Sequence, residues 1–271
     1  MTTDFGEQFR FRSVLAACAH PDDESFGLGA IISTFGELGI ETTLLCFTHG
    51  EASTLGTNNN DLAHRRATEL EAAAAVLGIR STRLLSYPDG HLSEVSVEEL
   101  SANVEDLAGA RSIDCLLVFD EGGITGHPDH QAATAAARAT AARLDLPVLA
   151  WTLPSTVTEA LNLDFAAGFI GRDASEIDLT VHVDRRLQHE AIRCHTSQSS
   201  DNPVLRRRLA LQGSGESLIW LSALGERRIP RPTPRAHIPQ QVYPIRNSDT
   251  AEGPRNADSS DPWRASDSAR R

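Results

Sequence analysis

A short apolar run that ends in a cluster of acids near the N-terminus constrains the fold more than any other feature. Residues 14–19 are uncharged and apolar, and residues 20–24 follow as His-Pro-Asp-Asp-Glu. Short apolar runs of this kind are typical of central strands in a parallel sheet, which helices cover on both faces. A helix-like stretch, residues 25–38, comes next. The cluster is therefore expected at the carboxyl end of a strand, the edge where open α/β sheets bind ligands.

The three neighbouring acids of this cluster, Asp22, Asp23 and Glu24, need a positive partner. Carboxylates at close range repel one another, so at least one pKa would rise without a counter-charge. The chain has a formal net charge of −12 and offers no general basic surplus. A divalent cation is the partner that this pattern favours.

A second cluster has the same relation to a strand. Residues 115–119 are apolar, and residues 126–130 read Gly-His-Pro-Asp-His before another helix-like stretch, residues 131–144. Two such strand ends can meet at one edge of a sheet. Two histidines and an aspartate form a ligand set found in catalytic zinc sites, with a fourth position left for water.

Strand-like and helix-like segments alternate over the first 150 residues. This pattern predicts an α/β fold with a Rossmann-like, doubly wound, mostly parallel sheet flanked by helices. Residues 178–183 alternate between polar and apolar, which is typical of an outer strand, and residues 154–176 are expected to form an irregular cap. The segments expected as further strands are residues 42–48, 83–86, 147–153 and 217–221, and those expected as further helices are residues 61–77, 97–108, 185–195 and 203–211.

The composition changes after residue 226. More than half of the chain's 13 prolines lie beyond this point, and apolar residues are sparse and without period. Such a segment buries too little surface to offset the entropy of ordering it. We therefore predict one domain, residues 1–226, followed by a disordered tail rich in proline and arginine, residues 227–271.

The charge and the four cysteines limit the partners and the compartment. A strongly acidic chain is a poor partner for nucleic acid or for an anionic membrane surface. No apolar run is long enough to span a bilayer, and the N-terminus lacks a signal-peptide pattern. Three of the four cysteines lie in apolar runs, which is typical of reduced, buried thiols. A cytoplasmic protein acting on a small molecule is expected.

The motifs at residues 19–24 (Ala-His-Pro-Asp-Asp-Glu), 126–130 and 195–198 (His-Thr-Ser-Gln), in this order, resemble those of the PIG-L/LmbE-like zinc-dependent de-N-acetylases. That family includes N-acetylglucosaminyl-phosphatidylinositol deacetylase and the deacetylases of mycothiol and bacillithiol synthesis. The similarity spans about residues 12–221. It implies a zinc hydrolase that releases acetate from an N-acetylglucosamine-type conjugate, and relatives often form homo-oligomers.

The resemblance also implies a role for individual residues. The metal ligands would be His20, Asp23 and His130. The same ligand types also accept Fe²⁺ or another divalent ion. Asp22 matches the general base that activates the attacking water. His127 matches the residue that stabilises the oxyanion and helps to protonate the leaving amine.

Other positions would support the site or contact the substrate. Arg66 matches a position that contacts the sugar, and Asp89 matches one that contacts the sugar or lies behind the ligands. Glu24, Asp129 and His195 are expected behind the ligands, with Asp129 supporting a protonated His127. For Arg66 the alternative is a salt bridge with Glu69 or a solvated helix face. For His127 and His195 the alternatives are a helix cap and a helix C-terminal turn.

One position departs from the family pattern. The thiol-pathway relatives have a tyrosine two residues before the first histidine of the second motif, and here that residue is Thr125. A mycothiol-type substrate is therefore in question.

Two other functions are compatible with the same motifs. The first is a zinc amidase for a non-sugar amide or a secondary metabolite. The second is a catalytically silent binding protein of the same fold, which the intact Asp22 and ligand set disfavour.

Overall fold

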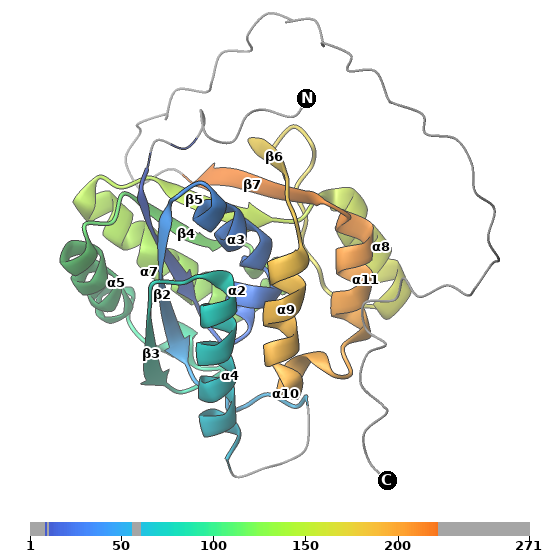
Figure 1. Ribbon diagram of the computed structural model, residues 1–271, viewed down its shortest axis with the longest axis horizontal. Coiled ribbons are helices and arrows are strands. Elements are labelled where there is room, and N and C mark those ends of the chain that lie inside the picture. The colour runs from blue at the N-terminus through green and yellow to red at the C-terminus, as the bar shows by residue number, and fades with distance from the viewer. Residues whose placement is uncertain (1–8, 10, 56–60, 222–271) are drawn as a thin grey trace, which may run out of the picture. The chain divides into compact units, whose positions relative to one another are not determined.

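A seven-stranded sheet forms the centre of the molecule. The computed structural model describes residues 9, 11–55 and 61–221. The strand order is β3-β2-β1-β4-β5-β7-β6 (Figure 1). The first five strands are parallel to one another, whereas β7 is antiparallel to both β5 and β6. The strands are β1 (Ser13–Cys18), β2 (Glu41–Thr48), β3 (Ser81–Tyr87), β4 (Cys115–Phe119), β5 (Val148–Thr152), β6 (Leu179–His182) and β7 (Gly215–Leu221).

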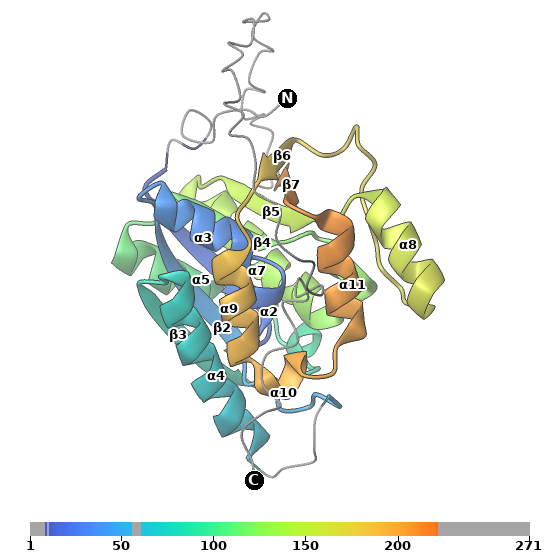
Figure 2. The same cartoon turned by 45° about the vertical axis from the view of Figure 1, so that its right-hand side comes forward.

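Helices cover both faces of this sheet. Figures 1 and 2 show α3, α4 and α9 in front of the strands and α5 and α7 behind them. The helical elements are α2 (Asp23–Phe26), α3 (Gly29–Glu37), α4 (Leu62–Leu77), the short 3₁₀ turn η1 (Leu92–Glu94), α5 (Val97–Arg111), α6 (Gly123–Gly126), α7 (Pro128–Leu144), α8 (Ser155–Phe165), α9 (Arg186–Cys194), α10 (Thr196–Ser199) and α11 (Pro203–Gln212).

Strand β1 is apolar throughout because it contributes to two cores. Val14 and Ala16 point into the core on the α3 and α4 side, and Leu15 and Ala17 point into the core on the α5 and α7 side. Alternate side chains of a strand leave opposite faces of the sheet. A strand buried on both faces is therefore uniformly apolar.

The chain order places the two motif clusters side by side. Strand β1 pairs with β2 on one side and with β4 on the other, with Ala16 opposite Leu117. The connections run in opposite directions away from β1, which makes this pair the switch point of the sheet. The prediction of a Rossmann-like, mostly parallel sheet is confirmed, and the strand ends of β1 and β4 lie where such folds bind ligands.

Several local predictions need correction. Residues 155–165 form helix α8 instead of an irregular cap, and residues 25–38 form two helices, α2 and α3. Asp61 precedes α4 without a capping hydrogen bond from its side chain, and Gly78 ends this helix in the left-handed conformation. The predicted domain boundary at residue 226 and the tail lie outside the described residues.

Among the helices that the structure describes, none is both long and apolar enough to cross a membrane.

Candidate active site

A cavity of about 630 Å³ opens over the carboxyl ends of the central strands. Its residues come from the carboxyl ends of β4 and β5, from the segments after β1, β2, β3, β4 and α8, and from α4, α10 and α11. The polar part of its lining includes His20, Asp22, Asp23, Arg66, Asp89, Thr125, His127, His130, Gln198 and Arg208. Residues from both sequence motifs therefore face one space.

Three of these residues could hold a metal ion. His20, Asp23 and His130 each offer one ligand atom, and these atoms lie within 4.8 Å of one another. The Asp23 carboxylate is central, with Oδ1 3.1 Å from Nε2 of His130 and Oδ2 3.8 Å from Nδ1 of His20. Two imidazoles and one carboxylate match the donor set of a catalytic zinc site.

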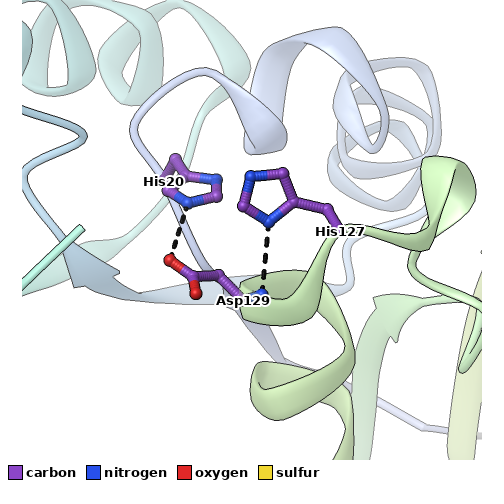
Figure 3. Close-up of side chains that lie close together, drawn as sticks. All are labelled: His20, His127 and Asp129. Atoms are coloured by element: carbon purple, nitrogen blue, oxygen red, sulfur yellow. Dashed lines mark hydrogen bonds and ion pairs between the residues drawn. The ribbon is translucent and has the colours of Figure 1, made fainter. Parts of the chain in front are cut away.

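Hydrogen bonds on the far side of each ring aim both imidazoles at this point. Nε2 of His20 lies 3.1 Å from Asp89 and 3.2 Å from Asp129 (Figure 3). Nδ1 of His130 lies 3.2 Å from the Gly123 carbonyl oxygen. If these ring nitrogens donate, then Nδ1 of His20 and Nε2 of His130 carry free lone pairs. Metal-binding histidines are oriented in this way in many proteins.

The charges around this centre also fit a cation. Burial would lower the pKa of His20, but the carboxylates of Asp129 and Asp89 raise it to about 10. Burial would raise the pKa of Asp23, but the two histidines and a backbone amide hold it well below its usual value. The carboxylates thus favour positive charge between them.

A second group of three potential ligands shares His20. His20, His127 and Asp129 also place donor atoms within 4.8 Å of one another. The Asp129 carboxylate, however, already accepts hydrogen bonds from the backbone amides of Gly90 and Leu92 as well as from His20. This group is therefore less suited to a metal.

Asp22 lies beside the candidate ligands and faces the cavity. Its φ of 127° is unusual for a residue with a side chain, and such strain is often found at functional sites. Burial raises the pKa of Asp22 to about 6, although the Arg66 guanidinium opposes this effect. A carboxylate with a pKa near neutrality can both accept and return a proton.

Arg66 holds the Asp22 loop in place. It is buried on α4 and donates from Nη2 to the Pro21 carbonyl oxygen (2.5 Å) and to the Asp22 carboxylate (2.9 Å), and from Nη1 to the Gly50 carbonyl oxygen (2.6 Å). The sequence alternative of a salt bridge with Glu69 is wrong, because Arg65 makes that contact. Arg66 also lines the cavity.

His127 precedes α7 at its N-terminus and also lines the cavity. Its ring lies 4.9 Å from that of His20 and stacks 4.8 Å from that of His130, measured between centroids. Its Nδ1 accepts a hydrogen bond from the Asp129 backbone amide (Figure 3), which is a helix cap and leaves Nε2 as the hydrogen-bearing nitrogen of the neutral ring. The cap expected as an alternative is therefore present together with exposure to the cavity.

The expectation that Asp129 supports a protonated His127 needs correction. The Asp129 carboxylate bonds to His20 instead, and only its backbone amide reaches His127. Burial, together with His130 and His20, lowers the pKa of His127. The neutral ring is the favoured form in this arrangement.

Glu24 and His195 form a buried pair behind the site. Nε2 of His195 lies 2.6 Å from Oε1 of Glu24, and both residues are fully buried. Oε2 of Glu24 accepts a hydrogen bond from the Asp22 backbone amide. The third motif therefore supports the Asp22 loop through Glu24, and it does not reach the cavity through His195.

Sequence reasoning missed one wall of the cavity. Phe26, Phe119, Trp151, Phe169 and Leu205 make this wall apolar. Phe119 and Trp151 lie at the carboxyl ends of their strands, which is a signal that could have identified them. Arg208, at the same wall, lies in a run of three arginines on α11, and nothing in the sequence distinguishes it from its neighbours.

A Rossmann-like sheet with a histidine and aspartate centre at its switch point is the frame of a metal-dependent hydrolase. Residues 15–141 match the family model described as PIG-L, GlcNAc-PI de-N-acetylase. A 1D-myo-inositol 2-acetamido-2-deoxy-alpha-D-glucopyranoside deacetylase from Nakamurella multipartita is 32% identical over 207 residues, which cover 60% of this chain and 68% of the relative. The chain belongs to the PIG-L family, as the motifs predicted.

A protein of the same name from Kineococcus radiotolerans is 29% identical over 150 residues. The match covers 44% of this chain and only 42% of that relative, so the chain spans less than half the length of this protein.

Among solved structures, the N,N'-diacetylchitobiose deacetylase of Pyrococcus horikoshii is similar in fold. The TM-score is 0.59 at 22% identity, and the match covers 79% of this chain and 85% of that one. The names of these relatives agree with the predicted class of enzyme, a hydrolase of N-acetyl amides.

Proposed function

We propose that this chain is a metal-dependent N-deacetylase that releases acetate from an N-acetylglucosamine-type conjugate. One observation carries this proposal. Asp22 and His127 line the same cavity as the candidate metal ligands His20, Asp23 and His130. A proton acceptor, a hydrogen-bond donor and a cation centre are parts that metal-dependent hydrolysis of an amide uses.

His20, Asp23 and His130 would hold the cation. Zinc suits two imidazoles and one carboxylate, and Fe²⁺ is a second candidate for the same donors. When bound, such an ion polarises an amide carbonyl and lowers the pKa of water beside it.

Asp22 would take the proton from the attacking water. The Arg66 contact holds its carboxylate in place. Its raised pKa of about 6 makes Asp22 a stronger base than an ordinary aspartate, and the acid formed can still protonate an amine. As the water oxygen bonds to the amide carbon, negative charge develops on the carbonyl oxygen. His127 can donate a hydrogen bond to this oxygen from Nε2 without being charged.

Breaking the carbon–nitrogen bond completes the reaction. The leaving nitrogen takes the proton that Asp22 holds, so one water and one amide yield one amine and acetic acid. His127 lies beside His20 and His130 and can orient the leaving nitrogen for this transfer. In this scheme Asp22 ends in the ionised form in which it began.

The polar lining of the cavity supports a sugar as the group that carries the amine. Ser53 donates to Gln198 at 2.7 Å, Asp89 accepts the Ala52 amide at 2.8 Å, and these residues all line the cavity. Sugar hydroxyls need such donors and acceptors. Three consecutive asparagines, Asn58, Asn59 and Asn60, would offer further such groups, and they lie outside the described residues.

We also propose a reducing compartment, and so a cytoplasmic one. Cys18, Cys46, Cys115 and Cys194 are free thiols, and the first three are buried. Burial raises the pKa of the Cys115 thiol, which keeps it protonated and unreactive.

The test is acetate release from a panel of N-acetylglucosamine glycosides and simple N-acetyl amides by the zinc-loaded protein. We expect release from the glycosides. Release only from non-sugar amides would support the alternative amidase and overturn the sugar class. A protein that binds glycosides but releases no acetate from any compound would be the silent binder, and the proposal would fail.

A further inference from the structure

Arg208 is a buried cation at the apolar wall of the cavity. It lies on α11, is 5% exposed and lines the cavity. Its guanidinium carbon lies 5.0 Å from the centre of the Trp151 ring. Burial lowers the pKa of Arg208 to about 10, so the side chain still carries its charge at neutral pH.

The hydrogen bonds of this guanidinium leave most of its donors free. Nη1 donates to Oε1 of Gln212 at 2.8 Å, and Nη2 donates to the Phe26 carbonyl oxygen. A guanidinium carries five N–H donors. Over the described part of the chain, these two contacts are the only hydrogen bonds that Arg208 makes.

The nearest buried acid is already engaged. Glu216 pairs with Arg185 through Oε1, and its Oε2 accepts hydrogen bonds from Trp151 and Gln212. Gln212 thus stands between Arg208 and Glu216. Among the described residues, no carboxylate oxygen lies within 4 Å of the Arg208 nitrogens, whereas Arg66, the other arginine of the cavity, is paired with Asp22.

Burying a charge without a partner is costly, and a planar guanidinium matches a carboxylate in shape. The aromatic side chains between Arg208 and the catalytic end leave an apolar path. Phe119 packs against the His130 ring at 4.9 Å and against Trp151 at 5.2 Å. A ligand that reaches Arg208 from the metal centre must cross this aromatic surface.

We propose that Arg208 is an anion subsite that selects substrates with a carboxylate at the end of an apolar substituent. The inference rests on the proposed function for the amide that is cut, and it adds the chemistry of the far end of the substrate. The carboxylate can belong to the group attached to the sugar or to the acyl group. The recognition chemistry is the same in both cases.

The experiment compares matched substrates. The first pair is para-carboxyphenyl and para-carbamoylphenyl N-acetylglucosaminide, which differ in charge but little in shape. The second pair is N-glutaryl and N-valeryl glucosamine, which place the carboxylate on the acyl side. We expect kcat/KM of the native protein to favour the anion by about tenfold or more in one pair, and that pair locates the carboxylate.

Arg208→Met should abolish this preference while Arg207→Met keeps it. Arg207 is the matched control, because it is the next residue on the same helix but pairs with Asp164 at the surface. Arg208→Lys keeps the charge and should retain part of the preference, which separates loss of recognition from loss of folding. Equal rates for anionic and neutral substrates in both pairs would overturn the proposal and leave the deacetylase intact.

Calorimetric binding of both pairs of compounds gives a readout that needs no turnover. If the deacetylase proposal fails, tighter binding of the carboxylate than of the carboxamide, lost in Arg208→Met, still supports the subsite. If neither anionic probe, the glycoside or N-glutaryl glucosamine, binds more tightly than its neutral partner, the subsite is disproved whatever the catalytic result.

Discussion

At the scale of single residues, two neighbouring carboxylates have opposite environments. Asp23 accepts hydrogen bonds from the amides of Ala19 and His20 and faces His130, and these contacts favour its charged form. Asp22 is partly buried with one guanidinium for a partner, and burial raises its pKa to about 6. Neighbouring acids with pKa values driven apart are suited to different tasks, here ligand and base.

Gly50→Ala should disturb Asp22, the proposed base, through Arg66 and without altering Asp22 itself. Gly50 has a φ of +66°, and a Cβ there would lie 2.3 Å from Nη1 of Arg66. Moving this guanidinium removes the partner of Asp22, so we expect kcat to fall by about tenfold or more. The measurement is acetate release at saturating substrate.

Gly39→Ala is the control for the backbone cost alone. Gly39 has a similar φ of +74°, and a Cβ there meets no atom within 4 Å. We expect both variants to lose about 1 kcal/mol of unfolding free energy from the left-handed backbone. If the two variants keep equal activity, Arg66 does not position Asp22.

Glu24→Gln tests the buried pair behind the site. Glu24 accepts hydrogen bonds from His195, Ser25 and the Asp22 amide, and an amide side chain cannot accept all of them. We expect a loss of about 3 kcal/mol in unfolding free energy, measured by denaturant titration. Glu190→Gln, at an exposed pair with Arg186, should change it by less than about 1 kcal/mol. Equal losses would contradict a supporting role for Glu24.

At the scale of elements, Asp120 joins three segments at the edge of the sheet. It follows β4 and accepts hydrogen bonds from Thr152 at the end of β5 (2.8 Å) and from Nε and Nη2 of Arg172, which follows α8 (2.8 and 2.9 Å). Burial would raise the pKa of Asp120, but Arg172, the Gly122 amide and Thr152 lower it.

A lowered pKa in the folded state sets the sign of a pH effect. The contribution of Asp120 to stability is complete above the ordinary aspartate pKa of 3.8 and is lost as the pH falls through the lower folded value. Asp120→Asn should cost about 2 kcal/mol near pH 7, and the gap to the native protein should begin to close below about pH 4, as the pH falls toward the lower folded pKa. Thermal unfolding of both proteins from pH 7 to below about pH 4 measures this difference in stability. A gap that stays constant with pH would show that charge is not involved.

The sequence identified elements wherever apolar pattern alone determines structure. Strands β1 and β4 are buried on both faces, so their uniform apolar runs could be recognised as central strands from the sequence. Helix α8 was missed because its sequence, Ser-Thr-Val-Thr at the start, favours strands and Pro154 at its cap position makes no side-chain capping bond.

Pairings between distant residues were beyond the sequence. The first two motifs predicted that His20, Asp23 and His130 lie together, because both motifs follow central strands. The contact of Arg66 with Asp22, 44 positions apart, depends on how α4 packs, and the choice of Arg208 among three neighbouring arginines depends on the rotation of α11. Such contacts follow from tertiary geometry, which local periodicity does not specify.

At the scale of the whole molecule, a bound cation should stabilise the fold. The carboxylates of Asp23, Asp89 and Asp129 meet around His20, and they come from the start of α2, the loop after β3 and the start of α7. A ligand that binds only the folded state raises its stability. We expect a chelator to lower Tm by several degrees and zinc to restore it. An unchanged Tm would argue against a metal at this centre.

The central claim is that Asp23 holds the metal and Asp22 moves the proton. The most direct measurement is zinc content and acetate release for Asp22→Asn and Asp23→Asn, purified side by side with the native protein. We predict that Asp22→Asn keeps about one zinc per chain and loses at least about a hundredfold in kcat, whereas Asp23→Asn loses the metal as well. Near-native turnover by Asp22→Asn, or native zinc content in Asp23→Asn, would contradict the account.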